Sequence, residues 1–384
     1  MSRHRTWIEI NERALQQNIN TLQGLLSGGA RFCAIVKANA YGHGLKEVTH
    51  IAARQGVDAF GVDTIEDALL IRSWLPSALV LTLGYVLPEQ YEEAVHERIH
   101  LTMYDLDALR LLEEEAKKQA GTAFVHLKIE TGTQRQGLSE FDLKRYLQSL
   151  STFPHIQIAG VSTHFANIED TSDTSFATLQ FHRFQKTVEQ IQTAGIQPEH
   201  IHCACSAAII LYPSTHGSLV RAGISLYGVW PSEITETTTR RHGIACDLRP
   251  VLSWKTRIAQ VRSIPAGTPI SYGMTETVSK PTRIAVIPVG YWDGYDRSLS
   301  SVGEVLIAGN RCKVLGRICM NMMMVDASSV PHIEPGQEVI LIGRSGRHEI
   351  SASVLAKQAK TVPYEVLARL NPLLPRQVIS ETIV

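Results

Sequence analysis

The chain has 384 residues, more than one hydrophobic core normally holds, so its length favours two domains. Lysine plus arginine and aspartate plus glutamate each number 37, and this zero formal charge argues against a nucleic-acid partner or a charged membrane surface. There is no apolar run of the roughly 20 residues that a membrane span needs and no signal-peptide pattern, and the scattered cysteines have no CxxC spacing, so we expect a cytoplasmic protein without a disulfide framework or a metal site.

Strand-like and helix-like segments alternate through the first part of the chain. A short strand at residues 7–10 comes first, and Asn11 is a suitable N-cap for a helix that ends near residue 26. Eight further strand-like segments follow, at residues 32–36, 59–62, 79–83, 100–103, 123–129, 156–163, 201–204 and 219–226. Helical patterns fill most of the gaps, at residues 45–55, 64–74, 89–96, 106–119, 140–150 and 175–194. This alternation favours parallel βαβ units.

Eight strands is the number that closes a (β/α)8 barrel, the TIM barrel fold. We therefore predict an α/β chain whose first domain, residues 1–235, is such a barrel. An open doubly wound sheet is the alternative that the same alternation allows. The strand at residues 7–10 is left over from the barrel and could join the second domain.

The pattern changes after residue 230. Residues 231–249 are polar with a run of threonines, and they predict a linker or a long loop. Short β-rich segments punctuated by Gly and Pro follow at residues 253–261, 282–289, 303–307, 313–318, 322–325 and 338–342. They are typical of a mainly antiparallel β domain, which we place at residues 236–384, with a helix at residues 352–360.

Lys37 ends the first strand of the predicted barrel, within the sequence VKANAYGHG at residues 36–44. Burial disfavours a charged ammonium, and a neutral lysine amine is a nucleophile, as a lysine that forms a Schiff base must be. The alternative is a lysine whose long side chain reaches from the strand end into water. Active-site groups of (β/α)8 barrels lie at the carboxyl ends of the strands, so the other strand ends help to decide.

Polar side chains of catalytic type do follow other strands. They are Lys128, Glu130 and Arg135 after the fifth strand, His164 after the sixth, Ser206 after the seventh, and Arg221 and Gly223 in the eighth. Several have ordinary alternatives, namely a structural histidine, a serine N-cap and a packing glycine. Arg221 is harder to explain in this way, because a buried guanidinium needs a partner.

The loops after strands seven and eight are the usual phosphate site of this fold. Ser206 and the backbone amides near Gly223 suit that task, since N–H groups at the start of a helix attract anions. A phosphate site together with a reactive lysine indicates an enzyme that uses pyridoxal 5'-phosphate.

Motifs along essentially the whole chain resemble those of the alanine racemases, the fold-type III pyridoxal-phosphate enzymes. Besides VKANAYGHG they are RAGISLYG at residues 221–228, SYGMTET at 271–277, IPVGYWDGYDR at 287–297, GRICMN at 316–321 and TVPYEV at 361–366. They occur in the family's order. The resemblance implies a barrel followed by a β domain, in a head-to-tail homodimer whose active sites combine one barrel with the partner's β domain.

The resemblance also implies a role for each matching residue. Lys37 binds the cofactor covalently and acts as one base, and Tyr272 of the other subunit acts as the second base on the opposite face. The residues expected at the phosphate are Tyr41, Ser206, Gly223, Ile224 and Tyr364. Arg221 is expected to face the pyridine nitrogen, with His164 linking it to Tyr272. Arg135 and the partner-supplied Met320 are expected at the substrate carboxylate.

The activity so implied is the interconversion of L-alanine and D-alanine, which supplies D-alanine for peptidoglycan. Two bases suit this reaction, because one group does not easily reach both faces of a planar carbanion. Three positions depart from the family's usual residues: Asn321 stands for Asp, Thr133 for Met and Cys205 for Asn. A serine racemase or a broad-specificity amino-acid racemase is therefore the alternative. Lys128 matches a lysine that is carbamylated in some members.

Two other functional classes are weighed against this one. A fold-type III amino-acid decarboxylase would share the barrel and the lysine, but it would carry a carboxylate where Arg221 stands. Because arginine has no realistic conjugate base, it should leave the ring nitrogen unprotonated, which disfavours decarboxylation. A non-enzymatic pyridoxal-phosphate carrier would lack a β domain bearing Tyr272.

Overall fold

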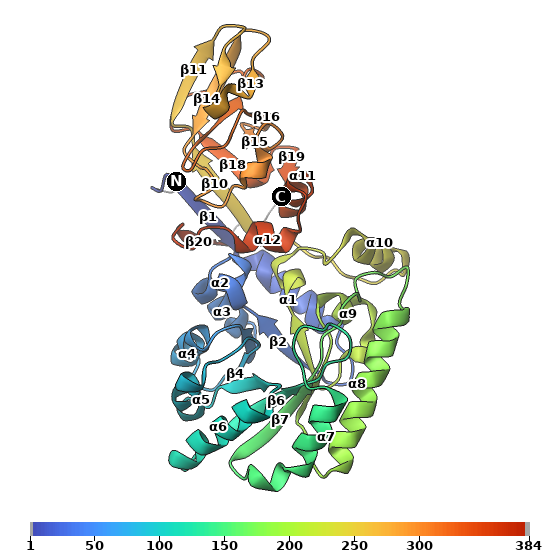
Figure 1. Ribbon diagram of the computed structural model, residues 1–384. Coiled ribbons are helices and arrows are strands. Elements are labelled where there is room, and N and C mark those ends of the chain that lie inside the picture. Colours follow the sequence, from blue (N-terminus) through green and yellow to red (C-terminus); the bar gives the residue numbers. More distant parts are fainter. Residues whose placement is uncertain (1–2, 381–384) are drawn as a thin grey trace. The chain divides into compact units, whose positions relative to one another are not determined.

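A computed structural model describes residues 3–380, and the chain separates into two compact units (Figure 1). The barrel unit contains residues 15–38 and 48–249. The β unit contains residues 39–47 and the described parts of residues 1–14 and 250–384. None of the described helices is both long and apolar enough to cross a membrane.

The barrel unit is built on eight parallel strands that are hydrogen-bonded in the order β8-β7-β6-β5-β4-β3-β2-β9. They are β2 (Arg31–Ile35), β3 (Ala59–Val62), β4 (Leu79–Thr82), β5 (His100–Met103), β6 (Ala123–Lys128), β7 (Ile156–Ser162), β8 (His200–His202) and β9 (Leu219–Ala222). Backbone hydrogen bonds of 3.0 Å from Ser218 N to Ile201 O and from Arg221 N to Ala204 O join the two ends of this order. The sheet therefore closes into a barrel, and the open doubly wound alternative is wrong.

Helices follow most of the strands and lie on the outside of the barrel in Figure 1. They are α1 (Glu12–Gly24), α3 (Leu45–Arg54), α4 (Ile65–Trp74), α5 (Tyr91–His96), α6 (Leu106–Lys118), α7 (Glu140–Gln148), α8 (Ser175–Thr193), α9 (Ser206–Leu211) and α10 (Glu233–Arg241). Local capping sets several starts, since Thr64 accepts a hydrogen bond from Asp67 N and Asp105 accepts one from Ala108 N. Strands β3, β4 and β9 are buried along their whole length, as expected where helices cover a parallel sheet.

Two predictions for the end of the barrel are wrong. The strand expected at residues 219–226 stops at Ala222, because Ile224–Tyr227 form a 3₁₀ turn that ends at Gly228 with φ of 78°. The loop expected at residues 231–249 contains α10, which Ser232 caps by accepting a hydrogen bond from Thr235 N at 3.0 Å. Threonine has a low helix propensity, so the threonine run of α10 concealed the helix in the sequence.

The β unit contains a mainly antiparallel sheet in the order β11-β14-β17-β16-β15-β18-β10-β1-β20, with β19 paired to β18. Its strands are β1 (Thr6–Asn11), β10 (Leu252–Arg257), β11 (Gln260–Ile264), β14 (Thr282–Ile287), β15 (Glu304–Ile307), β16 (Asn310–Leu315), β17 (Met323–Asp326), β18 (Glu338–Ser345), β19 (His348–Ile350) and β20 (Arg376–Ile379). A separate small sheet pairs β12 (Pro269–Ile270) with β13 (Glu276–Thr277). The predicted antiparallel β architecture is confirmed.

Strand β1 lies between β10 and β20 in this sheet, antiparallel to the first and parallel to the second (Figure 1). The single strand expected at residues 253–261 is two strands, β10 and β11, which lie apart in the sheet order. The helix expected at residues 352–360 is α11 (Ala352–Ala359), and a second helix, α12 (Pro363–Ala368), follows with Pro363 in its first turn.

Candidate active site

Lys37 opens a turn of unusual backbone conformation, α2 (Lys37–Tyr41). Ala38, Asn39, Ala40 and Tyr41 all have φ of 52–53°, which is the left-handed region. Each such residue with a side chain costs ~1–2 kcal/mol, so the following segment must hold the turn in place. Asn39 does so twice, since its side chain accepts a hydrogen bond from Leu45 N at 2.8 Å and its carbonyl accepts one from Gly44 N at 2.9 Å.

The side chain of Lys37 is not buried in the chain by itself. It is 40% exposed, and its Nζ lies 3.9 Å from Oδ1 of Asp63, just after β3. The expectation of a desolvated lysine is therefore wrong for the single chain. The strand end nevertheless holds the amine at the carboxyl end of the barrel strands, where the candidate groups of the barrel unit lie.

Arg221, in β9, is buried and held by acceptors from two neighbouring segments. One terminal nitrogen donates to Nδ1 of His202 at 2.6 Å and to its carbonyl at 2.9 Å. The other donates to the carbonyl of Thr163 at 2.8 Å and contacts Nδ1 of His164 at 3.4 Å. Its Nε–H has no acceptor among the described residues. Because a guanidinium only donates, the acceptors on His202 and Thr163 fix the orientation of the Arg221 side chain.

The two histidines that contact Arg221 are neutral. Burial, and then the charge of Arg221, hold the pKa of His164 and that of His202 well below the usual range. Since the Nδ1 of each ring faces a guanidinium, Nδ1 must accept and Nε2 must carry the proton. The structure thus brings His164 to Arg221, as expected, and leaves His164 with an Nε2–H to donate.

Lys128, at the end of β6, is buried beside the same arginine. Burial and the charges of Arg221 and Arg135 lower the pKa of Lys128 well below its ordinary value. Arg135 itself is exposed on the loop after β6, close enough to act on Lys128, His164 and Arg221. A lowered pKa favours the neutral amine, which is the form of a lysine that reacts with carbon dioxide.

Ser206 connects the loops after β8 and β9. Its Oγ accepts hydrogen bonds from Gly223 N at 3.0 Å and from Ser225 N at 3.3 Å, and its own hydroxyl proton has no acceptor among the described residues. The buried hydroxyl of Ser225 also has no hydrogen-bond partner there. Ser206, Gly223 and Ile224 therefore lie together around unused donors, a set that fits a phosphate group.

Tyr41 and Tyr364 lie together in the β unit, with ring centroids 6.2 Å apart. A close backbone contact brings them together, because a Cβ on Gly42 would lie 2.0 Å from the carbonyl oxygen of Leu367. Leu367 belongs to α12, the helix that carries Tyr364. Gly42 also has φ of 79°, so both its conformation and its surroundings require glycine.

Tyr272 and Met320 lie on connected loops of the β unit. Ser271 Oγ donates to Arg317 O at 2.6 Å, and Trp292 N donates to Met320 O at 3.0 Å. The side chains at this place are largely exposed, with Tyr272 at 73% and Met320 at 55%. The exposed apolar residues of these loops are Tyr272, Met274, Tyr291, Trp292, Met320 and Met322. Exposed apolar side chains that gather in this way occur at protein–protein contacts, membrane contacts and ligand-binding grooves.

The three departures from the expected pattern have different surroundings. Asn321 is exposed next to Met320. Thr133 donates its hydroxyl to Glu130 at 3.2 Å, while burial raises the pKa of the Cys205 thiol. None of the described residues forms a group of three or more His, Cys, Asp or Glu that could hold a metal ion.

Sequence reasoning missed His202, the residue with the shortest contact to Arg221. Its signal was the alternation in HIH at residues 200–202, which puts two imidazoles on one face of a barrel strand. It also missed Asp63, which follows a fully buried strand in the same way as Lys37.

Comparison with known proteins identifies relatives along the whole chain. The family model for the alanine racemase N-terminal domain matches residues 10–231, and that for the C-terminal domain matches residues 251–378. An alanine racemase of Leptospira interrogans serovar Lai is 36% identical over 378 residues, or 98% of this chain and 96% of the relative. One from Symbiobacterium thermophilum is 37% identical over 379 residues and 98% of each chain. The solved structure of the alanine racemase of Clostridium difficile 630 matches with a TM-score of 0.92 and 31% identity, over 99% of this chain and 97% of that one.

Proposed function

Because the chain belongs to the alanine racemase family, whose members are isomerases, we propose that it interconverts L-alanine and D-alanine with pyridoxal 5'-phosphate and two bases. The two bases are Lys37 and, from a second copy of the chain, Tyr272. The observation that carries the proposal is the geometry of Arg221, whose two terminal nitrogens are fixed by His202 and Thr163 near the carboxyl ends of the barrel strands.

The residues at this mouth fit the cofactor. Ser206 and the amides of Gly223 and Ile224 would supply donors for its phosphate. The family resemblance adds Tyr41 and Tyr364, which lie together in the β unit, as further phosphate ligands. Arg221 would face the ring nitrogen, and since arginine does not give up its proton, it would leave that nitrogen unprotonated. When bound, the cofactor withdraws electrons from the α-carbon of the amino acid. An unprotonated ring withdraws them less strongly, which favours a racemase over a decarboxylase.

The protein's own groups move the proton. Lys37 Nζ takes or returns the α-proton on one face, and Tyr272 Oη does the same on the other. His164 carries its proton on Nε2 and can donate it to the Tyr272 oxygen, which stabilises that oxygen when it is charged. Arg135, exposed on its loop, and the backbone of Met320 hold the substrate carboxylate.

The exposure of Tyr272 supports a homodimer. A second base must lie in a water-poor site, and the loops that carry Tyr272 and Met320 present an apolar surface that a second copy can cover. The six free cysteines support a reducing cytoplasm as the place of action, where D-alanine would be supplied for peptidoglycan.

Mixing two inactive variants tests the shared site. Lys37→Ala and Tyr272→Phe chains should each lose racemisation of L-alanine by themselves. In mixed dimers, one of the two sites regains both bases, so co-expression should restore about one quarter of the wild-type activity on statistical assembly. Tyr85→Phe, at another exposed tyrosine, is the matched control and should keep full activity. A mixture as inactive as its components would refute the arrangement.

A serine or broad-specificity racemase is the second candidate. It is favoured by Asn321, which is uncharged and lies next to Met320. We propose that alanine is the preferred substrate, because the carboxylate contacts of Arg135 and Met320 do not depend on the Asn321 charge. Serine turning over several-fold faster than alanine in purified enzyme would reverse this ranking.

A further inference from the structure

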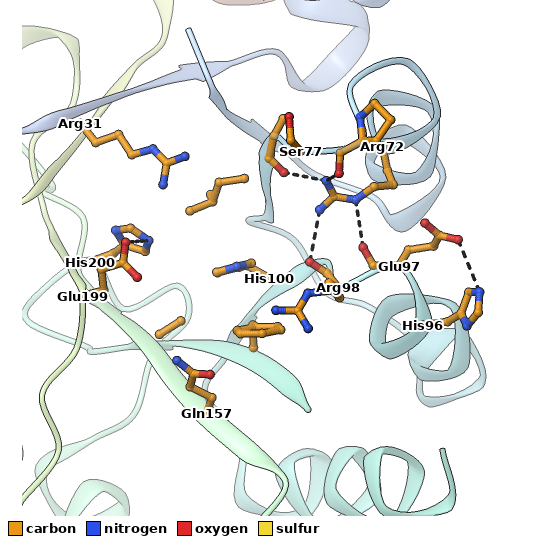
Figure 2. Close-up of a pocket in the computed structure, with 15 residues that line it drawn as sticks. Arg31, Arg72, Ser77, His96, Glu97, Arg98, His100, Gln157, Glu199 and His200 are labelled. Atoms are coloured by element: carbon orange, nitrogen blue, oxygen red, sulfur yellow. Dashed lines mark hydrogen bonds and ion pairs between the residues drawn. The ribbon is translucent and has the colours of Figure 1, made fainter. Parts of the chain in front are cut away.

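A second pocket opens at the amino-terminal ends of the barrel strands, opposite the end that carries Lys37 and Ser206 (Figure 2). Its volume is about 520 Å³. The first residues of four strands line it, namely Arg31, Leu79, His100 and His200. All of its lining residues belong to the barrel unit, so the pocket is complete within that unit.

Three arginines, which carry positive charge, line this pocket. Arg31 is paired with Asp58 at 3.0 Å, whereas Arg72 donates to the backbone carbonyls of Pro76 and Ala78, each at 2.7 Å. Arg98 lies with its guanidinium carbon 4.6 Å from the centre of the Phe124 ring, and no carboxylate of the described residues pairs with it. Arg72 and Arg98 therefore bring positive charge to the pocket without a carboxylate in direct contact.

Each carboxylate of the lining faces a neighbouring histidine. Glu97 lies 3.8 Å from His96, and Glu199 lies 3.5 Å from His200 (Figure 2). The lining around Phe124 is different, because the ring of Phe124 has His100 stacked at 5.0 Å between ring centres and the exposed Arg98 close to it. The surroundings of Phe124 thus combine a cation with an imidazole.

His100 is the open end of a chain of hydrogen bonds through the barrel. His100 Nδ1 lies 3.0 Å from His126 Nε2, and His126 Nδ1 lies 2.8 Å from His202 Nε2. His202 Nδ1 in turn accepts from Arg221. Strands β5, β6, β8 and β9 contribute one residue each to this row of hydrogen bonds.

The hydrogen bonds between these histidines can be donated in one direction only. Arg221 cannot accept, so His202 must donate from Nε2 to His126, and His126 must donate from Nε2 to His100. His100 is then left with Nε2–H as its free donor, in a residue that lines the pocket. Burial supports the neutral state by lowering the pKa of His100 to about 3 and that of His126 well below the usual range.

We propose that the pocket at the amino-terminal end of the barrel binds a small oxyanion, a phosphate or a carboxylate group, through the guanidinium of Arg98 and the Nε2–H of His100. An oxyanion only accepts, and these two groups only donate, so their chemistry matches. A bound anion also supplies the final acceptor of the histidine chain. Hydrogen bonds in a directed chain polarise one another, so a bound anion should strengthen the hydrogen bonds as far as His202, which holds Arg221.

Titration of the enzyme loaded with pyridoxal 5'-phosphate tests the site, because the cofactor then fills its own phosphate position at the other end of the barrel. Inorganic phosphate and acetate are titrated separately, and binding is followed calorimetrically. We expect at least one of them to bind wild-type enzyme, and Arg98→Gln to weaken it at least roughly tenfold. Arg145→Gln is the matched control, since Arg145 also lies over a phenylalanine ring, that of Phe141, at 5.7 Å.

Each outcome of the titration either supports or overturns the proposed site. Unchanged affinity in Arg98→Gln, or no binding of either anion, overturns the proposal. If Arg98→Gln does not fold, the site is tested instead in crystals of the cofactor-loaded wild-type enzyme that are soaked in selenate. We expect anomalous density beside Arg98 and His100. The absence of such density overturns the site.

The ring-nitrogen NMR signals of His126 and His202 should shift on anion binding. Constant signals would refute an effect of the anion along the histidine hydrogen bonds. None of these readouts depends on racemase activity.

Discussion

Arg221 donates to Nδ1 of His202 at 2.6 Å, and this contact fixes the guanidinium against the wall of the barrel. Lysine has a single ammonium without the planar fork, so it would not satisfy His202, Thr163 and Cys203 together. We expect Arg221→Lys to lower kcat for alanine racemisation by about 10²–10³-fold. Initial rates with L-alanine measure this, and Arg344→Lys, in a surface pair with Glu349, should be neutral. A loss smaller than about threefold in Arg221→Lys would show that the fork is dispensable.

Gly42→Ala should be far more damaging than Gly56→Ala. The two glycines have nearly the same φ, 79° and 80°, but only Gly42 has a backbone oxygen 2.0 Å from the position of a Cβ, while Gly56 has nothing within 4 Å. Gly56→Ala should cost ~1 kcal/mol of unfolding free energy for its left-handed conformation, and Gly42→Ala several kcal/mol more. Urea unfolding gives both values.

The same pair tests the cofactor site. Relief of the Gly42→Ala clash must displace Leu367 and with it α12, which carries Tyr364. Gly42→Ala should therefore also weaken pyridoxal-phosphate binding, measured from the cofactor's absorbance, while Gly56→Ala should not. Equal affinities in the two variants would mean that Tyr364 does not contribute to the site.

Lys128 should carry a carbamate. Burial, and then the charges of Arg221 and Arg135, lower the pKa of its amine well below the ordinary value and so favour the neutral form. Reaction with carbon dioxide forms an N–C bond, releases a proton and leaves an anion that the two arginines attract. Enzyme equilibrated with ¹³C-bicarbonate should show a carbamate signal that Lys128→Ala abolishes. Lys144→Ala, at an exposed lysine paired with Glu140, should retain it. A signal that is absent from the wild-type enzyme would refute the modification.

Acid should destabilise the protein before its carboxylates titrate. Burial lowers the pKa of His43 to about 4 and that of His100 to about 3, from an ordinary value of 6.5. Below about pH 6.5 these histidines become protonated in the unfolded chain but stay neutral in the folded chain. The free energy of unfolding should therefore fall as pH is lowered towards 4. Each buried histidine contributes up to ~1.4 kcal/mol per pH unit in this window.

Urea unfolding at several pH values between about 7 and 4 measures this slope. His43→Gln should reduce it by the contribution of one histidine. His182→Gln, at an exposed histidine, should leave it unchanged. If His43→Gln has the wild-type slope, His43 is protonated in the folded protein and its burial has no part in acid sensitivity.

The order and type of most elements followed from the sequence alone. The buried strand at Ala59–Val62 and the helix that Thr64 caps depend on the burial pattern and on hydrogen bonds within a few residues, and both are local properties. The placing of Lys37, Arg135, His164, Ser206 and Arg221 at one end of the barrel also followed, since parallel strands bring their carboxyl ends to the same edge.

Only the tertiary structure decided how those groups are held. The hydrogen bonds among His100, His126, His202 and Arg221 join residues 26, 76 and 19 positions apart, so they depend on the register between strands. The left-handed turn at Ala38–Tyr41 contradicts the local preference of its residues, because contacts made later in the chain offset its strain. Local periodicity fixes which segments form, whereas the partners of a buried donor are set by whichever distant acceptors the closed barrel brings within reach.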